Sequence, residues 1–178
     1  WRLHIGPAPP ERSVVLTADD GHRSVFTDML PIVREFNVPV TLFIYPSAIS
    51  NAAYAMTWDQ LRILTATGLF DIQSHTYWHP NFATEKRRLP PAAYRGFMLT
   101  QLTRSKELLQ QRLGVNVDVI AWPFGVYDEE LLQIGADAGY VAGLTLDRRV
   151  ATGSDPIMAL PRFLITESGV GYRLLSPP

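Results

Sequence analysis

Two carboxylates and two imidazoles have the types and spacing needed for metal-assisted hydrolysis. Asp19 and Asp20 are adjacent and are followed by Gly21, while His75 and His79 lie four positions apart. One carboxylate with two imidazoles is a common ligand set for a catalytic divalent metal and leaves coordination positions open for water. A metal lowers the pKa of such a water and polarises a carbonyl, and a second carboxylate nearby can accept the proton.

Each part of this pattern has an ordinary explanation when it stands alone. An Asp-Asp-Gly triplet is usually a turn. Pro80 and Asn81 directly follow His79, which favours a loop over a helix that carries both histidines on one face. The chain has only four histidines, however, and two of them fall in this segment. The prediction of a metal site therefore depends on the combination.

Alternating strands and helices are expected to position these residues. Strands are indicated by short apolar, β-branched runs, and helices by apolar residues at helical spacing with capping residues at the ends. The predicted strands are residues 13–18, 38–44, 70–74, 117–121, 141–146 and 163–166. The predicted helices are residues 25–36, in which Pro31 marks a break, and residues 58–67, 91–113 and 128–138.

This alternation is typical of an α/β fold with mostly parallel strands, in the form of a barrel or an open sheet. A full eight-fold barrel needs about 250 residues, so a smaller version is expected for this length. Chemistry in such folds lies at the C-terminal ends of strands. Asp19 and Asp20 follow the first predicted strand, the histidines follow the third, and the Trp-Pro-Phe-Gly of residues 122–125 follows the fourth.

Composition limits the alternatives. The chain has 178 residues, 47% hydrophobic and 19% charged, with a net charge of -1. These values, with no repeat or linker, predict one globular domain over residues 1–178. Lys86-Arg87-Arg88 is too short for a nucleic-acid surface, and no apolar run approaches the roughly 20 residues of a transmembrane helix. Without cysteine, disulfides, thiolate zinc sites and Cys nucleophiles are excluded. Because the chain begins at Trp1, we expect a mature form or an excised domain, with any signal peptide outside this sequence.

From about Ser13 to Thr166 the sequence resembles the polysaccharide deacetylases that carry the chitooligosaccharide-deacetylase (NodB) homology domain, carbohydrate esterase family four. Members have Thr-Phe-Asp-Asp-Gly after a strand, and residues 17–21 read Thr-Ala-Asp-Asp-Gly. Members have His-Ser/Thr-x-x-His, and residues 74–79 read Ser-His-Thr-Tyr-Trp-His. Their third motif is Arg-Pro-aromatic-Gly, and residues 122–125 read Trp-Pro-Phe-Gly. The order and separation of the motifs also match.

The resemblance implies a role for each of these residues. Asp19 would be the general base, and Asp20, His75 and His79 would hold a divalent metal, zinc first, although cobalt, nickel or manganese could serve. The backbone N–H of Phe124 would help to hold the oxyanion. The implied fold is a distorted, incomplete (β/α) barrel. The implied partner is an acetylated polysaccharide or oligosaccharide, and the implied location is secreted, periplasmic or cell-surface.

The sequence departs from the family pattern in two places. Trp122 replaces the third-motif arginine that supports the catalytic aspartate. There is no Leu-x-His near the end, and no histidine follows the third motif, so the general acid is unassigned. Leu-Pro-Arg at residues 160–162 is similar to divergent members that include biofilm-type poly-N-acetylglucosamine deacetylases, and Arg162 is hypothesised to replace the lost arginine. His22 is a candidate acid or a simple loop residue, and Asp147 is a fourth-motif aspartate or a solvated turn.

Aromatic residues flank the predicted metal site. Tyr77, Trp78 and Trp122 could stack on sugar rings, although packing at the barrel mouth is favoured for Trp122. Tyr45 and Trp58 could extend a groove.

Three functions remain open: a deacetylase of an acetylated, N-acetylglucosamine-containing polysaccharide, a small-amide metal hydrolase on the same scaffold, and an inactive carbohydrate-binding domain. A shallow groove with exposed aromatic residues would favour the polymer, and a deep closed pocket the small amide. Retention of all four acidic and imidazole residues argues against the inactive domain.

Overall fold

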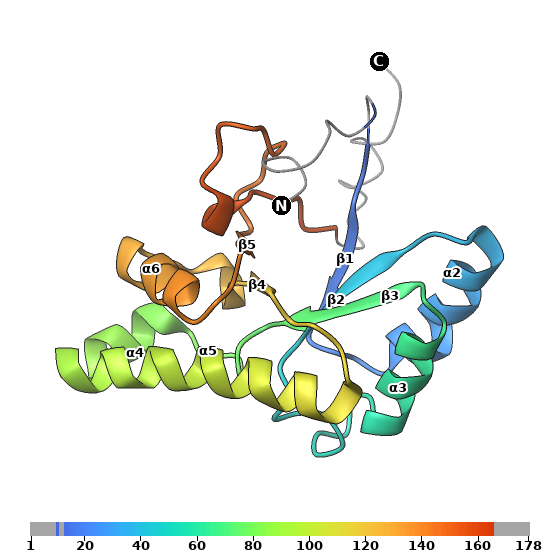
Figure 1. Cartoon of the computed structure of the whole chain (residues 1–178), viewed down its shortest axis with the longest axis horizontal. Helices are drawn as coiled ribbons and strands as arrows, with labels where there is room; N and C mark the ends of the chain where they lie inside the picture. The colour runs from blue at the N-terminus through green and yellow to red at the C-terminus, as the bar shows by residue number, and fades with distance from the viewer. Residues whose placement is uncertain (1–9, 11–12, 166–178) are drawn as a thin grey trace.

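Five parallel strands form one sheet in the computed structural model, which describes residue 10 and residues 13–165. The strands are β1 (Leu16–Asp19), β2 (Val40–Ile44), β3 (Phe70–Ser74), β4 (Val119–Ala121) and β5 (Ala142–Leu144). They pair side by side in chain order. The sheet curls, so that β1 stands steeply against β2 and β3 (Figure 1). The predicted α/β fold, an incomplete (β/α) barrel with parallel strands, is confirmed.

The helices connect the strands and cover the outside of the sheet (Figure 1). The four predicted helices are confirmed to within one or two residues, the usual uncertainty of helix ends. The helices are α2 (Leu30–Phe36), α3 (Trp58–Ala66), α4 (Phe82–Arg88), α5 (Pro91–Leu113) and α6 (Glu129–Asp137). A π-helical turn, η1 (Val25–Met29), precedes α2, and short 3₁₀ turns form η2 (Pro123–Gly125) and η3 (Ile157–Ala159).

Local sequence signals explain several helix ends. Thr57 and Gln60 form the predicted capping box at the start of α3. Gly114 ends α5 in a left-handed conformation with φ 68°, which costs glycine little. Pro31 is the second residue of α2, and it removes one backbone donor where the wider π-helical turn η1 passes directly into α2. The break expected at Pro31 is therefore the change from the π-helical turn to α2.

Two expectations about secondary structure are wrong. Residues 82–88 are absent from the predicted helices but form α4, where the side chain of Asn81 accepts the backbone N–H of Thr84 and Arg88 pairs with Glu85. Residues 163–165 were expected to be strand but are irregular, and Thr166 lies outside the described residues. The sheet contact at this end is made earlier, because Leu160 forms an isolated parallel bridge with Leu144.

The core lies between the curled sheet and the helices that cover it. Strand β3 packs against α3 and α5, and buried apolar residues of β2, β3, α3 and α5 belong to one core cluster. Met98, Leu102 and Leu109 of α5 are fully buried, as are Leu61 and Leu64 of α3. This packing fixes the strands and therefore the loops at their C-terminal ends.

Within the described part of the chain, no helix combines the length and the apolar character needed to cross a membrane.

Candidate metal centre

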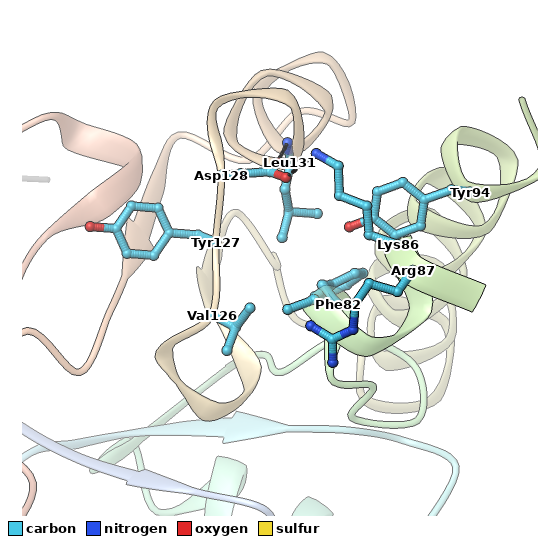
Figure 2. Close-up of a pocket in the computed structure, with 9 residues that line it drawn as sticks. Phe82, Lys86, Arg87, Tyr94, Val126, Tyr127, Asp128 and Leu131 are labelled. Carbon is cyan, nitrogen blue, oxygen red and sulfur yellow. Dashed lines mark hydrogen bonds and ion pairs between the residues drawn. The ribbon is translucent and has the colours of Figure 1, made fainter. Parts of the chain in front are cut away.

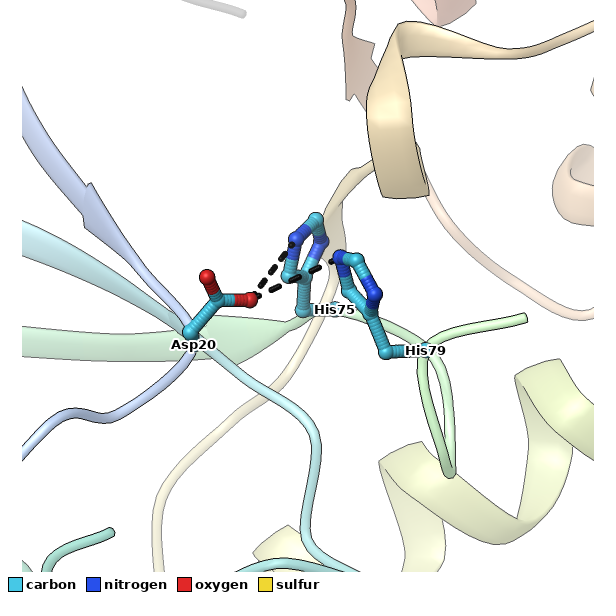
Figure 3. Close-up of side chains that lie close together, drawn as sticks. All are labelled: Asp20, His75 and His79. Carbon is cyan, nitrogen blue, oxygen red and sulfur yellow. Dashed lines mark ion pairs between the residues drawn. The ribbon is translucent and has the colours of Figure 1, made fainter. Parts of the chain in front are cut away.

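Asp20, His75 and His79 converge at the C-terminal edge of the sheet (Figure 3). Asp20 follows β1, whereas His75 and His79 lie in the connection between β3 and α4. Oδ1 of Asp20 is 3.6 Å from Nε2 of His75 and 3.5 Å from Nε2 of His79. One ligand atom from each of the three residues lies within 4.8 Å of the other two. The structure thus brings together the three residues predicted to hold a metal.

The two histidines reach the same point because the backbone between them turns sharply. Thr76 and His79 adopt left-handed conformations, with φ of 64° and 63°. This region is unfavourable for a β-branched residue such as Thr76, and such strain is concentrated at functional sites. The side chain of Thr76 stabilises the turn, because its Oγ1 accepts the backbone N–H of His79 at 3.2 Å. The histidines therefore share a tight loop rather than a helix face.

Buried polar side chains of α5 support this loop. Gln101 accepts the backbone N–H of Trp78 at 3.1 Å, and Ser105 bonds to the hydroxyl of Ser74 at 2.8 Å. Gln101 and Ser105 are both buried. Buried polar groups in helices usually need such partners, so these contacts fix the register between α5 and the histidine loop.

The imidazole of His75 is oriented for metal binding. Its Nδ1 lies 2.7 Å from the carbonyl oxygen of Ala121, so the N–H is on Nδ1 and the lone pair of Nε2 faces Asp20. Burial lowers the pKa of His75 to about 4, against the opposing effect of the Asp19 charge. Partial burial also lowers the pKa of His79. Both imidazoles are therefore neutral at pH 7, the form that metals bind.

The donor set fits a divalent cation. Oδ1 of Asp20 is buried and has no hydrogen-bond partner among the described residues. It faces the nitrogens of two imidazoles that are neutral. A buried carboxylate oxygen without a partner needs an explanation, and an ion is one of the few available. Because two imidazoles and one carboxylate suit several divalent metals, the donor set leaves the identity of the metal open.

Asp19, the predicted base, lies beside this cluster and is held by an arginine. Its Oδ2 is 3.7 Å from Nε2 of His75. Arg162 binds both carboxylate oxygens of Asp19, with Nη1–Oδ1 of 2.8 Å and Nη2–Oδ2 of 2.5 Å. It also donates to the hydroxyl of Thr17 and to the carbonyl of Thr145. Arg162 therefore lies in the position that the sequence hypothesis gave it, and its guanidinium fixes the orientation of Asp19.

Trp122 is not available to a substrate, and the suggestion that it contacts sugar is wrong. Its side chain is 0% exposed, and its Nε1 donates to the carbonyl of Met158 at 2.8 Å. Its ring packs where Gly135 and Gly143 leave room, since a Cβ at Gly143 would lie only 2.7 Å from Nε1. The alternative reading, that Trp122 packs the barrel, is the correct one.

Phe124 contributes both its backbone and its ring to the site. It adopts a left-handed conformation with φ 59°, and among the described residues its backbone N–H has no hydrogen-bond partner. Its ring is 56% exposed and lies 4.5 Å from that of His79. The N–H is therefore available to a ligand, as the predicted oxyanion role requires.

The other aromatic candidates divide into two groups. Tyr77 and Trp78 lie against α5, where the Tyr77 ring is 4.0 Å from the guanidinium of Arg104 and Trp78 contacts Phe97. Tyr45 instead lies against the metal cluster, with its ring 5.2 Å from that of His79. Its hydroxyl bonds to that of Tyr54, a residue that no motif singles out.

The two polar candidates make local contacts. The ring of His22 stacks on Tyr54 with centroids 6.0 Å apart, and its Nδ1 contacts the hydroxyl of Ser24. Asp147 accepts hydrogen bonds from Tyr127 at 2.8 Å and from Thr145 at 3.0 Å. These contacts anchor Asp147 to the end of β5, so it is more than a solvated turn.

Comparisons with known proteins identify the family to which the chain is similar. Residues 6–143 match the family model described as polysaccharide deacetylase. The chain is 23% identical over 162 residues to a poly-beta-1,6-N-acetyl-D-glucosamine N-deacetylase of Staphylococcus aureus (strain MRSA252), with 89% of this chain and 56% of that protein covered. It thus spans little more than half the length of that relative.

Two solved structures share the fold. The Streptococcus pyogenes deacetylase PplD in complex with acetate superposes with a TM-score of 0.85 at 24% identity, covering 98% of this chain and 74% of that one. The BpsB deacetylase domain from Bordetella bronchiseptica gives a TM-score of 0.78 at 26% identity, covering 89% and 73%.

Proposed function

The chain belongs to the polysaccharide deacetylase family, and from that premise we propose that it is a metal-dependent hydrolase that removes acetyl groups from a polysaccharide. One observation carries this proposal above the others. A buried, unpartnered oxygen of Asp20 faces two neutral imidazoles, and an arginine-held carboxylate lies beside them. This arrangement contains a metal-ligand set and a separate base, the two parts that metal-assisted hydrolysis needs.

The residues around the cluster have distinct roles in this proposal. A divalent ion held by Asp20, His75 and His79, with zinc the first choice, would polarise the acetyl carbonyl and acidify a water. Asp19 would accept the proton of the attacking water, and Arg162 holds the carboxylate of Asp19 in a fixed orientation. The N–H of Phe124, which has no partner among the described residues, would donate to the carbonyl oxygen of the acetyl group as negative charge develops on it.

The proposed substrate is a polymer that contains N-acetylglucosamine, as in the name of the staphylococcal relative. Exposed aromatic residues support an extended substrate, since Phe124, which contacts His79, is 56% exposed, and Tyr54, which bonds to Tyr45, is 40% exposed. Aromatic rings of this kind offer faces on which sugars can stack. We further propose that residues 1–178 form one catalytic domain and that it acts outside the cytoplasm, where such polymers are found.

The test is acetate release from N-acetylglucosamine oligomers, acetylxylan and peptidoglycan, with and without a chelator. The variant Asp19→Asn should abolish release and retain the metal. Asp59→Asn, which removes an exposed carboxylate of α3, is the matched control and should be as active as the unchanged protein. Chelator-sensitive release that Asp19→Asn abolishes would support the proposal. Metal binding without acetate release from any of the polymers would contradict it.

A further inference from the structure

A pocket lies between the segments that follow the histidine loop and the Trp-Pro-Phe-Gly motif. It has a volume of about 330 Å³ and is lined on one side by α4 and the first turn of α5 and on the other by residues 126–131, which lead into α6 (Figure 2). This volume falls within the range of roughly 300–1,000 Å³ that is usual for small-ligand sites. None of the metal ligands lines this pocket.

The two walls of the pocket are direct continuations of the segments that carry the site. Phe82 follows His79 by three residues, and Val126 follows Phe124 by two. Consecutive Cα atoms are 3.8 Å apart, so Phe82 lies within about 11 Å of His79 and Val126 within about 8 Å of Phe124. Each wall of the pocket therefore begins within about 11 Å of a residue of the proposed reaction centre.

The lining is apolar at its base and charged at its rim. Phe82, Tyr94 and Leu131 are nearly or fully buried, and they form the apolar part. At the rim, Lys86 of α4 forms an ion pair of 2.5 Å with Asp128, which caps α6, so this pair ties the two walls together. The positive charge of Lys86 is thereby satisfied.

Arg87 is the rim residue with free hydrogen-bond donors. Among the residues that the structure describes it forms no ion pair, and its side chain makes one long hydrogen bond of 3.4 Å, to the hydroxyl of Thr84. Figure 2 shows its guanidinium on the opposite side of Phe82 from the Lys86–Asp128 pair. A ligand in the pocket would thus meet an apolar base and a cationic donor together.

We propose that this pocket is a subsite for an N-acetylated sugar unit next to the unit whose acetyl group is removed. An acetamido group matches the lining, because its methyl group is apolar and its carbonyl oxygen can accept from Arg87. A unit that already carries a free ammonium would be repelled by the same guanidinium. The subsite rests on the proposed function for its substrate class, and it makes the enzyme sensitive to acetylation of the neighbouring unit.

The test is binding of N-acetylglucosamine oligomers of increasing length, measured by calorimetry in the Asp19→Asn background so that no turnover occurs. Arg87→Ala should weaken binding of the longer acetylated oligomers about tenfold, the effect of losing one charge-assisted hydrogen bond, and should leave the monomer unaffected. Arg87→Lys should recover part of the loss. Arg88→Ala is the matched control, because Arg88 is on the same helix but pairs with Glu85 and does not line the pocket.

A second arm replaces the acetylated oligomers with fully deacetylated ones. These should bind more weakly than acetylated oligomers of the same length. Arg87→Ala should reduce the difference in affinity between the acetylated and the deacetylated oligomers. Equal affinity of the Arg87→Ala and Arg88→Ala variants for long acetylated oligomers would overturn the subsite, as would absence of binding at every length. Acetate release by the protein with Asp19 intact is measured separately. Acetate release combined with an unchanged oligomer affinity in Arg87→Ala would thus overturn the subsite and leave the proposed hydrolase intact. Length-dependent binding without acetate release would overturn the proposed hydrolase and leave the subsite intact.

Discussion

Replacing Arg162 tests whether a residue from the end of the described chain holds the base. Arg162 makes two hydrogen bonds to the carboxylate of Asp19, and hydrogen bonds to charged groups contribute about 1.5–3 kcal/mol each. The side chains of Arg162 and Asp19 are 13% and 24% exposed, so water can replace part of this interaction. We therefore expect Arg162→Ala to remove about 2–4 kcal/mol of transition-state stabilisation, or roughly 30- to 1,000-fold in kcat/KM.

The assay is acetate release on an active substrate, combined with metal content and urea unfolding. Metal content should stay stoichiometric, because Arg162 contacts Asp19 and none of the three proposed ligands. Arg162→Lys should fall between the alanine variant and the unchanged protein, since an ammonium keeps the charge but cannot bind both oxygens side by side. Arg149→Ala is the control, because Arg149 also pairs with an aspartate, Asp155, and within the described residues forms no hydrogen bond or ion pair with Asp19 or with the three proposed ligands.

Two results would refute this reasoning. If Arg162→Ala kept the kcat/KM of the unchanged protein, the bidentate pair would have no part in the reaction. If it lost the metal together with activity, Arg162 would act by organising the ligands, and its contact with the base would not be the cause. A loss of kcat/KM equal to that caused by Arg149→Ala would indicate that the Arg162→Ala variant is destabilised as a whole.

Two further predictions concern the metal and the core. His75→Ala should lose stoichiometric metal, and a chelator should lower the melting temperature of the unchanged protein but not of this variant, because a ligand at 100 times its Kd stabilises by about 2.7 kcal/mol. His22→Ala should retain the metal, and equal metal content in the two variants would exclude the site. Gly143→Ala should cost about 1–3 kcal/mol in urea unfolding, because its Cβ would lie 2.3 Å from the carbonyl oxygen of Met158. Gly153→Ala, with no atom within 4 Å, should be neutral, and equal midpoints for the two variants would contradict the packing argument.

Much of the fold follows from local signals in the sequence. The apolar, β-branched runs that become β1 to β5 and the capping residues of α3 and α6 act over a few residues, so they can be read directly. Helix α4 is the element that local signals do not predict. Helix α4 has seven residues and buries only Phe82, so it carries no apolar periodicity. Its stability comes from the Asn81 cap, the Glu85–Arg88 pair and contacts with α5.

The parts of the candidate site that directly follow strands could be predicted from the sequence. The parts whose positions depend on contacts between distant segments could not. Parallel strands end at one edge of the sheet, so placing Asp20 and His75 after β1 and β3 was enough to predict that they meet. The loop geometry of Thr76 and the approach of Tyr45 to His79 depend on tertiary packing, which no short motif records. Contact between Asp19 and Arg162 spans 143 positions, and only the family resemblance suggested it.

The two departures from the family pattern are connected in the structure. Trp122 fills the core at the end of β4, and its Nε1 holds the carbonyl of Met158, in the segment that leads to Arg162. Leu160 then pairs alongside β5, donating its N–H to the carbonyl of Gly143 at 2.7 Å. Two residues later Arg162 is within reach of Asp19. The tryptophan that takes the arginine's place in the motif thus anchors the segment that brings another arginine to the base, so that the chain keeps a guanidinium on Asp19 by a different route.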